Sequence, residues 1–350
     1  MIERQFVSMV SPTMGRNGAG GMPCQGVYHR LAGKHPRVAF IASHYEVDFS
    51  EHYLADLLAA RGYGFLGWNT RYRGAGSYFS LPDALADIGV GVRWLWEVGG
   101  AEQVVILGNS GGASLMAAYQ AAAETERRGD LFVSLQAHRG RPDVLTSWLD
   151  PSVTDEFDPV SVDPSLDMFD PHNGPPFAAD FTESYRAAQI ERNHRITAWC
   201  HRELDRLRVA GASDRNFAVS RTWADLRFTD ISIDPSERPP GCYAGDPRRA
   251  NYSAFGLAAH TTCRAWLGMW SLAESSCRAE PHLADVNVPS LVLQSTGDQG
   301  CFPSDAEAIH SALGATDKTI SYLAGDHYLT QPADARAGVA DLISGWVGAH

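Results

Sequence analysis

The feature that most constrains the fold is an alternation of short apolar runs with longer stretches of helical character. The runs are rich in β-branched and aromatic side chains, as expected of strands that are buried on both faces. The expected strands lie at residues 37–42, 65–68, 103–107, 131–135, 290–294 and 319–323. The expected helices lie between them, at residues 50–61, 81–98, 114–123, 304–313 and 333–347. This alternation predicts an α/β fold, with a mostly parallel central sheet flanked by helices on both faces.

The middle of the chain has a different sequence pattern. Residues 139–285 show no alternation of strands and helices: they begin with loops that contain four Asp-Pro pairs, continue with a charged helix expected at 181–209, and end in an aromatic-rich region. We interpret this segment as a mainly helical insertion. The predicted organisation is a core domain made of residues 1–138 and 286–350, interrupted by an inserted domain of residues 139–285.

Composition limits the partners and the compartment. The formal net charge of −12 disfavours nucleic acid and anionic membrane surfaces as partners. The six cysteines form no CxxC pair and no spacing typical of zinc sites, so we expect no metal. We expect reduced, buried thiols, although disulfides in an exported protein are the alternative. With no signal-peptide pattern and no apolar run long enough to span a membrane, a cytoplasmic location is expected. A homodimer is possible.

One motif points to nucleophilic chemistry. Residues 108–112 read Gly-Asn-Ser-Gly-Gly, which fits G-x-S-x-G, and they lie between an expected strand and an expected helix. A serine on such a sharp turn projects its hydroxyl above the sheet, and the helix N-terminus behind it stabilises developing negative charge. Ser110 is therefore the candidate nucleophile, the alternative being a structural glycine-rich turn.

A serine needs a base, and the base needs an orienting acid. His327 follows the last expected strand, where a parallel sheet collects its functional groups. Asp298 follows the preceding strand, so the two loops open on the same edge of the sheet. Three other carboxylates compete with Asp298 for the role of acid. They are Asp305, which we interpret as a helix cap, Asp326, which adjoins the histidine along the chain, and Asp143, which follows the fourth strand.

Taken together, these segments resemble the α/β-hydrolase superfamily with an inserted cap domain. The matched segments are residues 41–45, 108–112, 295–298 with 302–303, and 325–327, and the resemblance covers the sheet domain, somewhat over half of the chain. The resemblance implies Ser110 as nucleophile, His327 as base and Asp298 as acid. It also implies that the backbone N–H of Gly111 is one donor of the oxyanion hole.

The second oxyanion donor is expected after the first strand of the alternation. Members of the superfamily commonly carry His-Gly there, whereas this chain has Ser-His-Tyr-Glu at residues 43–46. Tyr45 stands where the glycine is expected. Tyr45 and Glu46 are therefore the candidate backbone donors.

For several other residues, the sequence allows either a role in substrate binding or a structural role. Arg71 and Arg73 follow the second strand, and we interpret them as a salt-bridge loop rather than as ligands of a substrate carboxylate. His138 and Arg139 either contact substrate or form the hinge into the insertion. The aromatics of the insertion are expected to be mostly core, with four that contact substrate under a cap: Trp223, Tyr243, Trp266 and Trp270.

The resulting expectation is a soluble serine hydrolase that cleaves a carboxylic ester through an acyl-enzyme. The substrate is expected to be small to medium in size and fairly apolar, and no cofactor is needed. A C–C bond hydrolase, a thioesterase or an acyltransferase would use the same groups. A ligand receptor that has kept the fold without catalysis is the alternative from another class.

Overall fold

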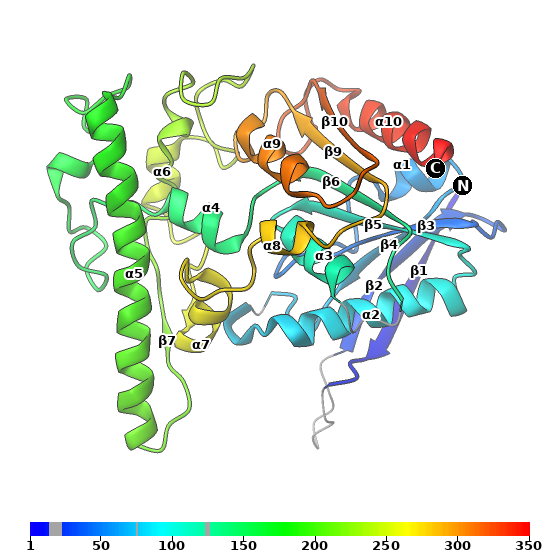
Figure 1. Cartoon of the computed structure of the whole chain (residues 1–350), viewed down its shortest axis with the longest axis horizontal. Helices are drawn as coiled ribbons and strands as arrows, with labels where there is room; N and C mark the ends of the chain where they lie inside the picture. The colour runs from blue at the N-terminus through cyan, green and yellow to red at the C-terminus, as the bar shows by residue number, and fades with distance from the viewer. Residues whose placement is uncertain (14–22, 75, 123–126) are drawn as a thin grey trace.

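The computed structural model describes residues 1–13, 23–74, 76–122 and 127–350, and its centre is one eight-stranded sheet (Figure 1). The strand order is β1-β2-β4-β3-β5-β6-β9-β10. The strands are β1 (Ile2–Val10), β2 (Pro23–Leu31), β3 (Val38–Ala42), β4 (Gly64–Asn69), β5 (Gln103–Ser110), β6 (Leu131–Ala137), β9 (Ser290–Ser295) and β10 (Lys318–Leu323).

The sheet is mostly parallel, as the sequence predicts. β4, β3, β5, β6, β9 and β10 pair in parallel, while β2 is antiparallel to both β1 and β4. All six predicted strands are confirmed. The antiparallel pair β1 and β2 was not predicted, because β1 is an edge strand with mostly exposed side chains and lacks a buried apolar run.

Two layers of helices cover the sheet (Figure 1). α1 (Ala55–Ala60) and α10 (Ala335–Ala349) pack on one face, and α2 (Leu81–Glu97), α3 (Gly112–Ala121) and α9 (Pro303–Ala312) pack on the other. The five expected helices are all present, but α1 is shorter than residues 50–61. Every residue of β4, β6 and β9 is buried, which explains why these strands are largely apolar and contain no charged residue.

The segment between β6 and β9 lies beside the sheet and contributes no strand to it (Figure 1). Its longest element is α5 (Ala179–Val209), close to the helix expected at 181–209. The other elements are short: α4 (Arg141–Trp148), η2 (Pro164–Leu166), β7 (Asn216–Phe217), η3 (Leu226–Phe228), α6 (Pro247–Asn251), β8 (Thr261–Thr262), α7 (Cys263–Ala265), the π-helical turn η4 (Trp266–Trp270) and α8 (Glu280–Leu283).

The insertion is fixed to the sheet domain by a shared apolar core. The buried cluster on the α2 and α3 face continues through Leu145 of α4 into Trp266 and Trp270 of η4, and it reaches Ile196 of α5. Leu283 of α8 belongs to the same cluster. Because this burial is continuous, the start and end of the insertion are held at the edge of the sheet where β5 and β6 terminate.

A buried ion pair ties the loop after β4 to α2. Arg71 Nη2 lies 2.7 Å from Asp87 Oδ1, and Asp87 is fully buried. Ser11 donates a second hydrogen bond to the same carboxylate oxygen, at 2.6 Å. Arg73 Nη1 lies 3.0 Å from Asp48 Oδ2 at the surface. The salt-bridge interpretation of Arg71 and Arg73 is therefore confirmed.

All six cysteines are buried, as expected, and each is a free thiol in the structure. Among the helices in the described part of the chain, none combines the length and the apolar character that a membrane crossing requires.

The Arg71–Asp87 pair makes a testable contribution to stability. Replacing Asp87 by asparagine keeps the shape but removes the nearer and fully buried counter-charge of Arg71, whose other partner, Asp83, lies 3.7 Å away. We therefore expect the free energy of unfolding to fall by about 3 kcal/mol. Urea denaturation measures the change. Asp341→Asn, which removes a mostly exposed partner of Arg61, is the control and should cost much less. Equal effects of the two substitutions would contradict the assignment.

The same pair predicts how stability depends on pH. Burial alone would raise the pKa of Asp87, but the hydrogen bonds from Arg71 and Ser11 bring it below its ordinary value. The pair therefore stabilises the fold at neutral pH, and this contribution is lost as the pH falls through the folded-state pKa. The stability difference between the wild type and Asp87→Asn should shrink in acid. A difference that stays constant down to strongly acidic pH would contradict this.

Candidate active site

Ser110 stands on a sharp turn between β5 and α3. Its φ angle is +53°, a left-handed conformation that costs free energy for a non-glycine residue, and the β5–β6 register shifts between Asn109 and Ser110. Two glycines permit the turn. A Cβ on Gly108 would lie 2.6 Å from Ala113 Cα, and one on Gly112 would lie 2.3 Å from the backbone oxygen of Ser43. The G-x-S-x-G spacing is thus required by close packing of strand, helix and the end of β3.

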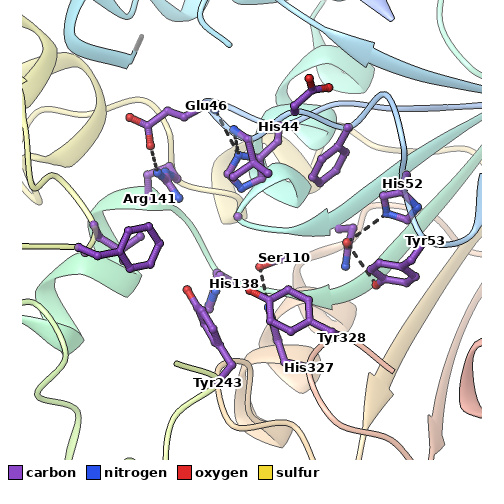
Figure 2. A pocket seen from close by; sticks show the side chains of 18 of the residues that line it. His44, Glu46, His52, Tyr53, Ser110, His138, Arg141, Tyr243, His327 and Tyr328 are labelled. Carbon is purple, nitrogen blue, oxygen red and sulfur yellow. Dashed lines mark hydrogen bonds and ion pairs between the residues drawn. The ribbon is translucent and has the colours of Figure 1, made fainter. Parts of the chain in front are cut away.

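A chain of hydrogen bonds leads away from the Ser110 hydroxyl. Ser110 Oγ lies 3.2 Å from His327 Nε2, and His327 Nδ1 lies 2.9 Å from Asp298 Oδ1 and 3.1 Å from Oδ2. The structure therefore brings together the three residues that the sequence selected from three separate loops. Figure 2 shows Ser110 and His327 facing each other in the cavity.

Asp298 is held as a buried acceptor. It is almost fully buried, and its Oδ1 accepts hydrogen bonds from the backbone N–H groups of Gly300, at 2.7 Å, and Cys301, at 3.0 Å. Both bonds come from the turn that follows β9. A carboxylate fixed in this way can hold one orientation and one tautomer of the imidazole.

The competing carboxylates are engaged elsewhere. Asp305 accepts from the backbone N–H of Phe302 at the start of α9, so the cap interpretation is confirmed. Burial raises the pKa of Asp305 to about 6. Asp326 accepts from backbone N–H groups of its own turn, including that of Tyr328. Asp143 pairs with Arg278 at 2.8 Å.

Aromatic rings fix the His327 imidazole. Tyr243, from the insertion, stacks on it with ring centroids 4.6 Å apart and an interplanar angle of 14°. Tyr328 packs edge-on at 5.0 Å. His138 lies 6.3 Å away, and burial together with the neighbouring His327 keeps the pKa of His138 well below its ordinary value. His138 is therefore an uncharged neighbour at neutral pH.

Ser110 opens into a cavity of about 440 Å³ between the sheet edge and the insertion (Figure 2). The sheet domain contributes most of the polar groups, and the sheet domain and the insertion contribute equally to the apolar wall. The apolar and aromatic lining comprises Val47, Phe49, Tyr53, Trp223, Tyr243, Phe255, Leu257 and Tyr328. Two of the four aromatics expected at the substrate, Trp223 and Tyr243, thus lie at the cavity.

The other two expected aromatics do not line it. Trp266 is fully buried and donates from Nε1 to Thr197 Oγ1 at 2.9 Å. Trp270 is also buried, with the Arg141 guanidinium 4.2 Å from its ring centroid. The expectation that Trp266 and Trp270 contact substrate is corrected accordingly: both belong to the core that joins η4 to α5 and α4.

The two residues at the start of the insertion, His138 and Arg139, have different roles. His138 lines the cavity, whereas Arg139 forms an ion pair with Glu280 of α8 and lies outside the lining. Sequence reasoning missed Phe255, Leu257 and Tyr328. Tyr328 adjoins His327 along the chain, which was an available signal. Phe255 and Leu257 lie in a loop without any distinguishing pattern.

The residues after β3 are arranged differently from the expectation. The Tyr45 side chain points into the core, where its hydroxyl lies 3.0 Å from Ser114 Oγ. The backbone N–H of Glu46 donates to Nδ1 of His44 at 3.2 Å. The expectation that Glu46 is a backbone oxyanion donor is therefore corrected, because its N–H already donates to His44. The backbone N–H of Gly111, at the start of α3, stays a predicted donor.

One cluster has the composition of a metal site. Asp298, Cys301 and His327 place possible ligand atoms within 4.8 Å of one another. However, Asp298 and His327 are bonded to each other, and Cys301 Sγ lies 2.9 Å from the Gln136 backbone oxygen. Burial raises the pKa of the Cys301 thiol well above its ordinary value, which disfavours the thiolate that a metal would need. These groups fit a hydrogen-bonded relay better than a metal centre.

The fold of the chain is similar to that of several solved structures. No protein-family model and no curated protein matches the chain. Among solved structures, DcsB in complex with its substrate analogue aligns with a TM-score of 0.58 at 13% identity, covering 99% of this chain and 98% of that one. The α/β hydrolase GrgF from Penicillium sp. sh18 also aligns with a TM-score of 0.58, at 11% identity, covering 99% and 97%.

A third structure extends the comparison. The esterase domain of a Rhodothermus marinus protein aligns with a TM-score of 0.50 at 13% identity, covering 98% of this chain and 97% of that one. At such identities the likeness concerns the fold. Together with the strand order and the turn at Ser110, it shows that this chain has the α/β-hydrolase fold.

Proposed function

We propose that this protein is a serine hydrolase that cleaves carboxylic esters through an acyl-enzyme. The observation that carries the proposal is the continuous set of hydrogen bonds from Ser110 through His327 to Asp298, at the floor of an open cavity. The name of the esterase domain among the structural neighbours supports the same reaction class.

The geometry supplies each step of the reaction. Ser110 Oγ attacks the ester carbonyl carbon while His327 Nε2 takes the hydroxyl proton. Asp298 keeps the proton on Nδ1 and stabilises the imidazolium that forms. The tetrahedral intermediate collapses, the C–O bond to the leaving alcohol breaks, and His327 returns the proton to that alcohol. Water then attacks the acyl-enzyme by the same route, which releases the acid and restores Ser110.

The cavity suggests the class of substrate. Its volume of about 440 Å³ suits a small to medium ligand, and aromatic rings dominate the wall opposite the sheet. Residues 139–285, which provide Trp223, Tyr243, Phe255 and Leu257, act in this proposal as a cap over the active site. The preferred acyl group is therefore fairly apolar. The proposed chemistry calls for no cofactor.

Thioester hydrolysis, C–C bond hydrolysis and acyl transfer to an alcohol would use the same three residues, so they are alternative outcomes of the tests below. A receptor without catalysis is disfavoured by one observation. Nothing in ligand binding requires a serine in a left-handed conformation to be bonded to an oriented imidazole, whereas nucleophilic catalysis does.

The assignment of the nucleophile is tested by labelling. A fluorophosphonate probe should phosphonylate Ser110 Oγ with loss of fluoride, and mass spectrometry of the labelled peptide should locate the adduct there. p-Nitrophenyl esters of increasing chain length should be hydrolysed, with a decline once the acyl chain exceeds the cavity. Ser110→Ala should abolish both reactions.

Two results would revise the proposal in different ways. Labelling of Ser110 without ester turnover would keep the nucleophile and direct the search to thioester, C–C or transferase substrates. Absence of any label on folded protein would contradict the hydrolase mechanism.

The role of Asp298 is tested by an isosteric change. In Asp298→Asn the amide can stabilise the wrong tautomer of His327 and no longer the imidazolium, so kcat should fall by about 10³- to 10⁴-fold. Asp305→Asn is the matched control, because this buried carboxylate follows the same strand but caps α9. It should lower stability while the folded enzyme keeps its kcat. Loss of kcat in the Asp305 variant alone would assign the acid to Asp305 instead.

A further inference from the structure

His44 occupies a position beside the nucleophile that the reaction described so far does not use. It follows β3, is 8% exposed, and lines the same cavity as Ser110. A Cβ on Gly111 would lie 2.8 Å from His44 Nε2. The absence of a side chain at Gly111 therefore creates the space into which this ring nitrogen projects. In Figure 2, His44 lies on one side of Ser110 and His327 on the other.

The hydrogen bonds around His44 identify its tautomer. Nδ1 lies 3.2 Å from the backbone nitrogen of Glu46 and 3.1 Å from that of Val47. Both backbone groups are donors, so Nδ1 must be the acceptor and carries no proton. The ring hydrogen of a neutral imidazole is then on Nε2, the nitrogen next to Gly111.

The ring is also neutral. Burial, and secondarily the neighbouring Arg141 cation, hold the pKa of His44 well below its ordinary value. At neutral pH the side chain is thus an imidazole with an Nε2–H donor. In the described ranges 1–13, 23–74, 76–122 and 127–350, no acceptor lies within hydrogen-bonding distance of this nitrogen. Because His44 lines the cavity, a bound ligand can supply the acceptor for this donor.

Arg141 makes the space beside Gly111 more favourable for a negatively charged ligand atom. Its Nη1 would lie 2.7 Å from a Cβ on Gly111, and its Nη2 donates to Glu46 Oε2 at 2.9 Å. The guanidinium packs over Trp270, which fixes its position. It is the one lysine or arginine among the described residues that line the cavity. The positive charge and the His44 Nε2–H donor therefore lie together, next to the residue whose backbone N–H is the expected oxyanion donor.

We propose that His44 is a catalytic residue that donates its Nε2–H to the oxyanion, alongside the backbone N–H of Gly111. The proposal rests on the serine-hydrolase function proposed above and names a side-chain donor for it. When Ser110 Oγ bonds to the carbonyl carbon, the π electron pair moves onto the carbonyl oxygen and the serine proton moves to His327. His44 keeps its proton throughout. Its hydrogen bond strengthens as the negative charge develops.

Two substitutions separate the donor from the structural role of the ring. In His44→Asn, the amide oxygen can take the place of Nδ1 as acceptor for the Glu46 and Val47 N–H groups, but no donor reaches Gly111. In His44→Gln, the longer amide can place an N–H near the position of Nε2. We expect kcat to fall about 10²- to 10³-fold in the asparagine variant with little change in KM, and the glutamine variant to recover part of the loss.

A transition-state analogue provides the selective readout. A trifluoromethyl ketone forms a hemiketal with Ser110 whose oxyanion occupies the same place, whereas the matching methyl ketone binds mainly as a ground-state ligand. In His44→Asn, the inhibition constant of the trifluoromethyl ketone should rise by the same factor as kcat falls, and that of the methyl ketone should hardly change. His52→Asn is the control, because this buried cavity histidine lies 3.2 Å from Asn109 Oδ1 and is already engaged. There both inhibitors should shift together.

The outcomes are distinguishable. Unchanged binding of the trifluoromethyl ketone to folded His44→Asn would overturn the proposal and leave the backbone N–H of Tyr45 as the second donor. Equal weakening of both ketones would assign His44 a structural role only, and would also overturn it. A failure of the hydrolase function itself appears differently, as an absence of fluorophosphonate label on Ser110 in the wild type.

Nitrogen NMR of ¹⁵N-histidine-labelled protein tests the tautomer without any activity. The His44 signals, identified by their loss in His44→Gln, should show a proton on Nε2 and none on Nδ1. A proton on Nδ1 would contradict the proposal.

Discussion

The site depends on the close approach of three backbone segments around Ser110. β5 must pass into α3 within two residues, and the end of β3 must reach the same point. The contact of Gly112 with the Ser43 backbone oxygen, and of Gly108 with Ala113, leaves no room for a side chain at either glycine. This packing holds Ser110 in a left-handed conformation, and the buried strands on both sides of β5 stabilise it. Because β3 ends at this point, His44 and Gly111 are brought side by side.

The reacting groups come from the sheet domain, whereas both parts of the chain shape the cavity. The sheet domain supplies Ser110, Asp298, His327 and His44, each from a loop at the end of a parallel strand. The insertion supplies Trp223, Tyr243 and Phe255 to the cavity wall, and Trp148 and Phe228 pack behind Trp223 in a separate buried cluster. Since the insertion shares its core with α2 and α3, the wall is held in place over the nucleophile by packing. Specificity for the acyl group should therefore change through substitutions in the insertion, and the rate of the chemical step through residues of the sheet domain.

Much of this could be predicted from the sequence, for physical reasons. Strands that are covered on both faces need largely apolar runs, so β3 to β6 and β9 were recognisable. β10 is an edge strand without a fully buried residue and was recognised by its place between two expected helices. The loops that follow β5, β9 and β10 located Ser110, Asp298 and His327. β1 was missed because an antiparallel edge strand faces solvent and needs no such apolar run. β2 lies inside the sheet, but its fully buried positions are interspersed with partly exposed ones, so it has no continuous apolar run. Trp266 and Trp270 were misplaced because core and cavity wall select the same aromatic residues. The arrangement of His44 was not predictable, since the ring orientation depends on the turn at Glu46 and Val47 and on the empty space above Gly111.

The central claim is that Ser110 carries the acyl group during turnover, and trapping that intermediate tests it most directly. The protein would be mixed with a p-nitrophenyl ester, quenched in acid within the first turnover, and weighed by intact-protein and peptide mass spectrometry. The account predicts a burst of p-nitrophenol matched by a mass increase of one acyl group, located on Ser110. Turnover without any acyl adduct, or an adduct on another residue, would contradict it.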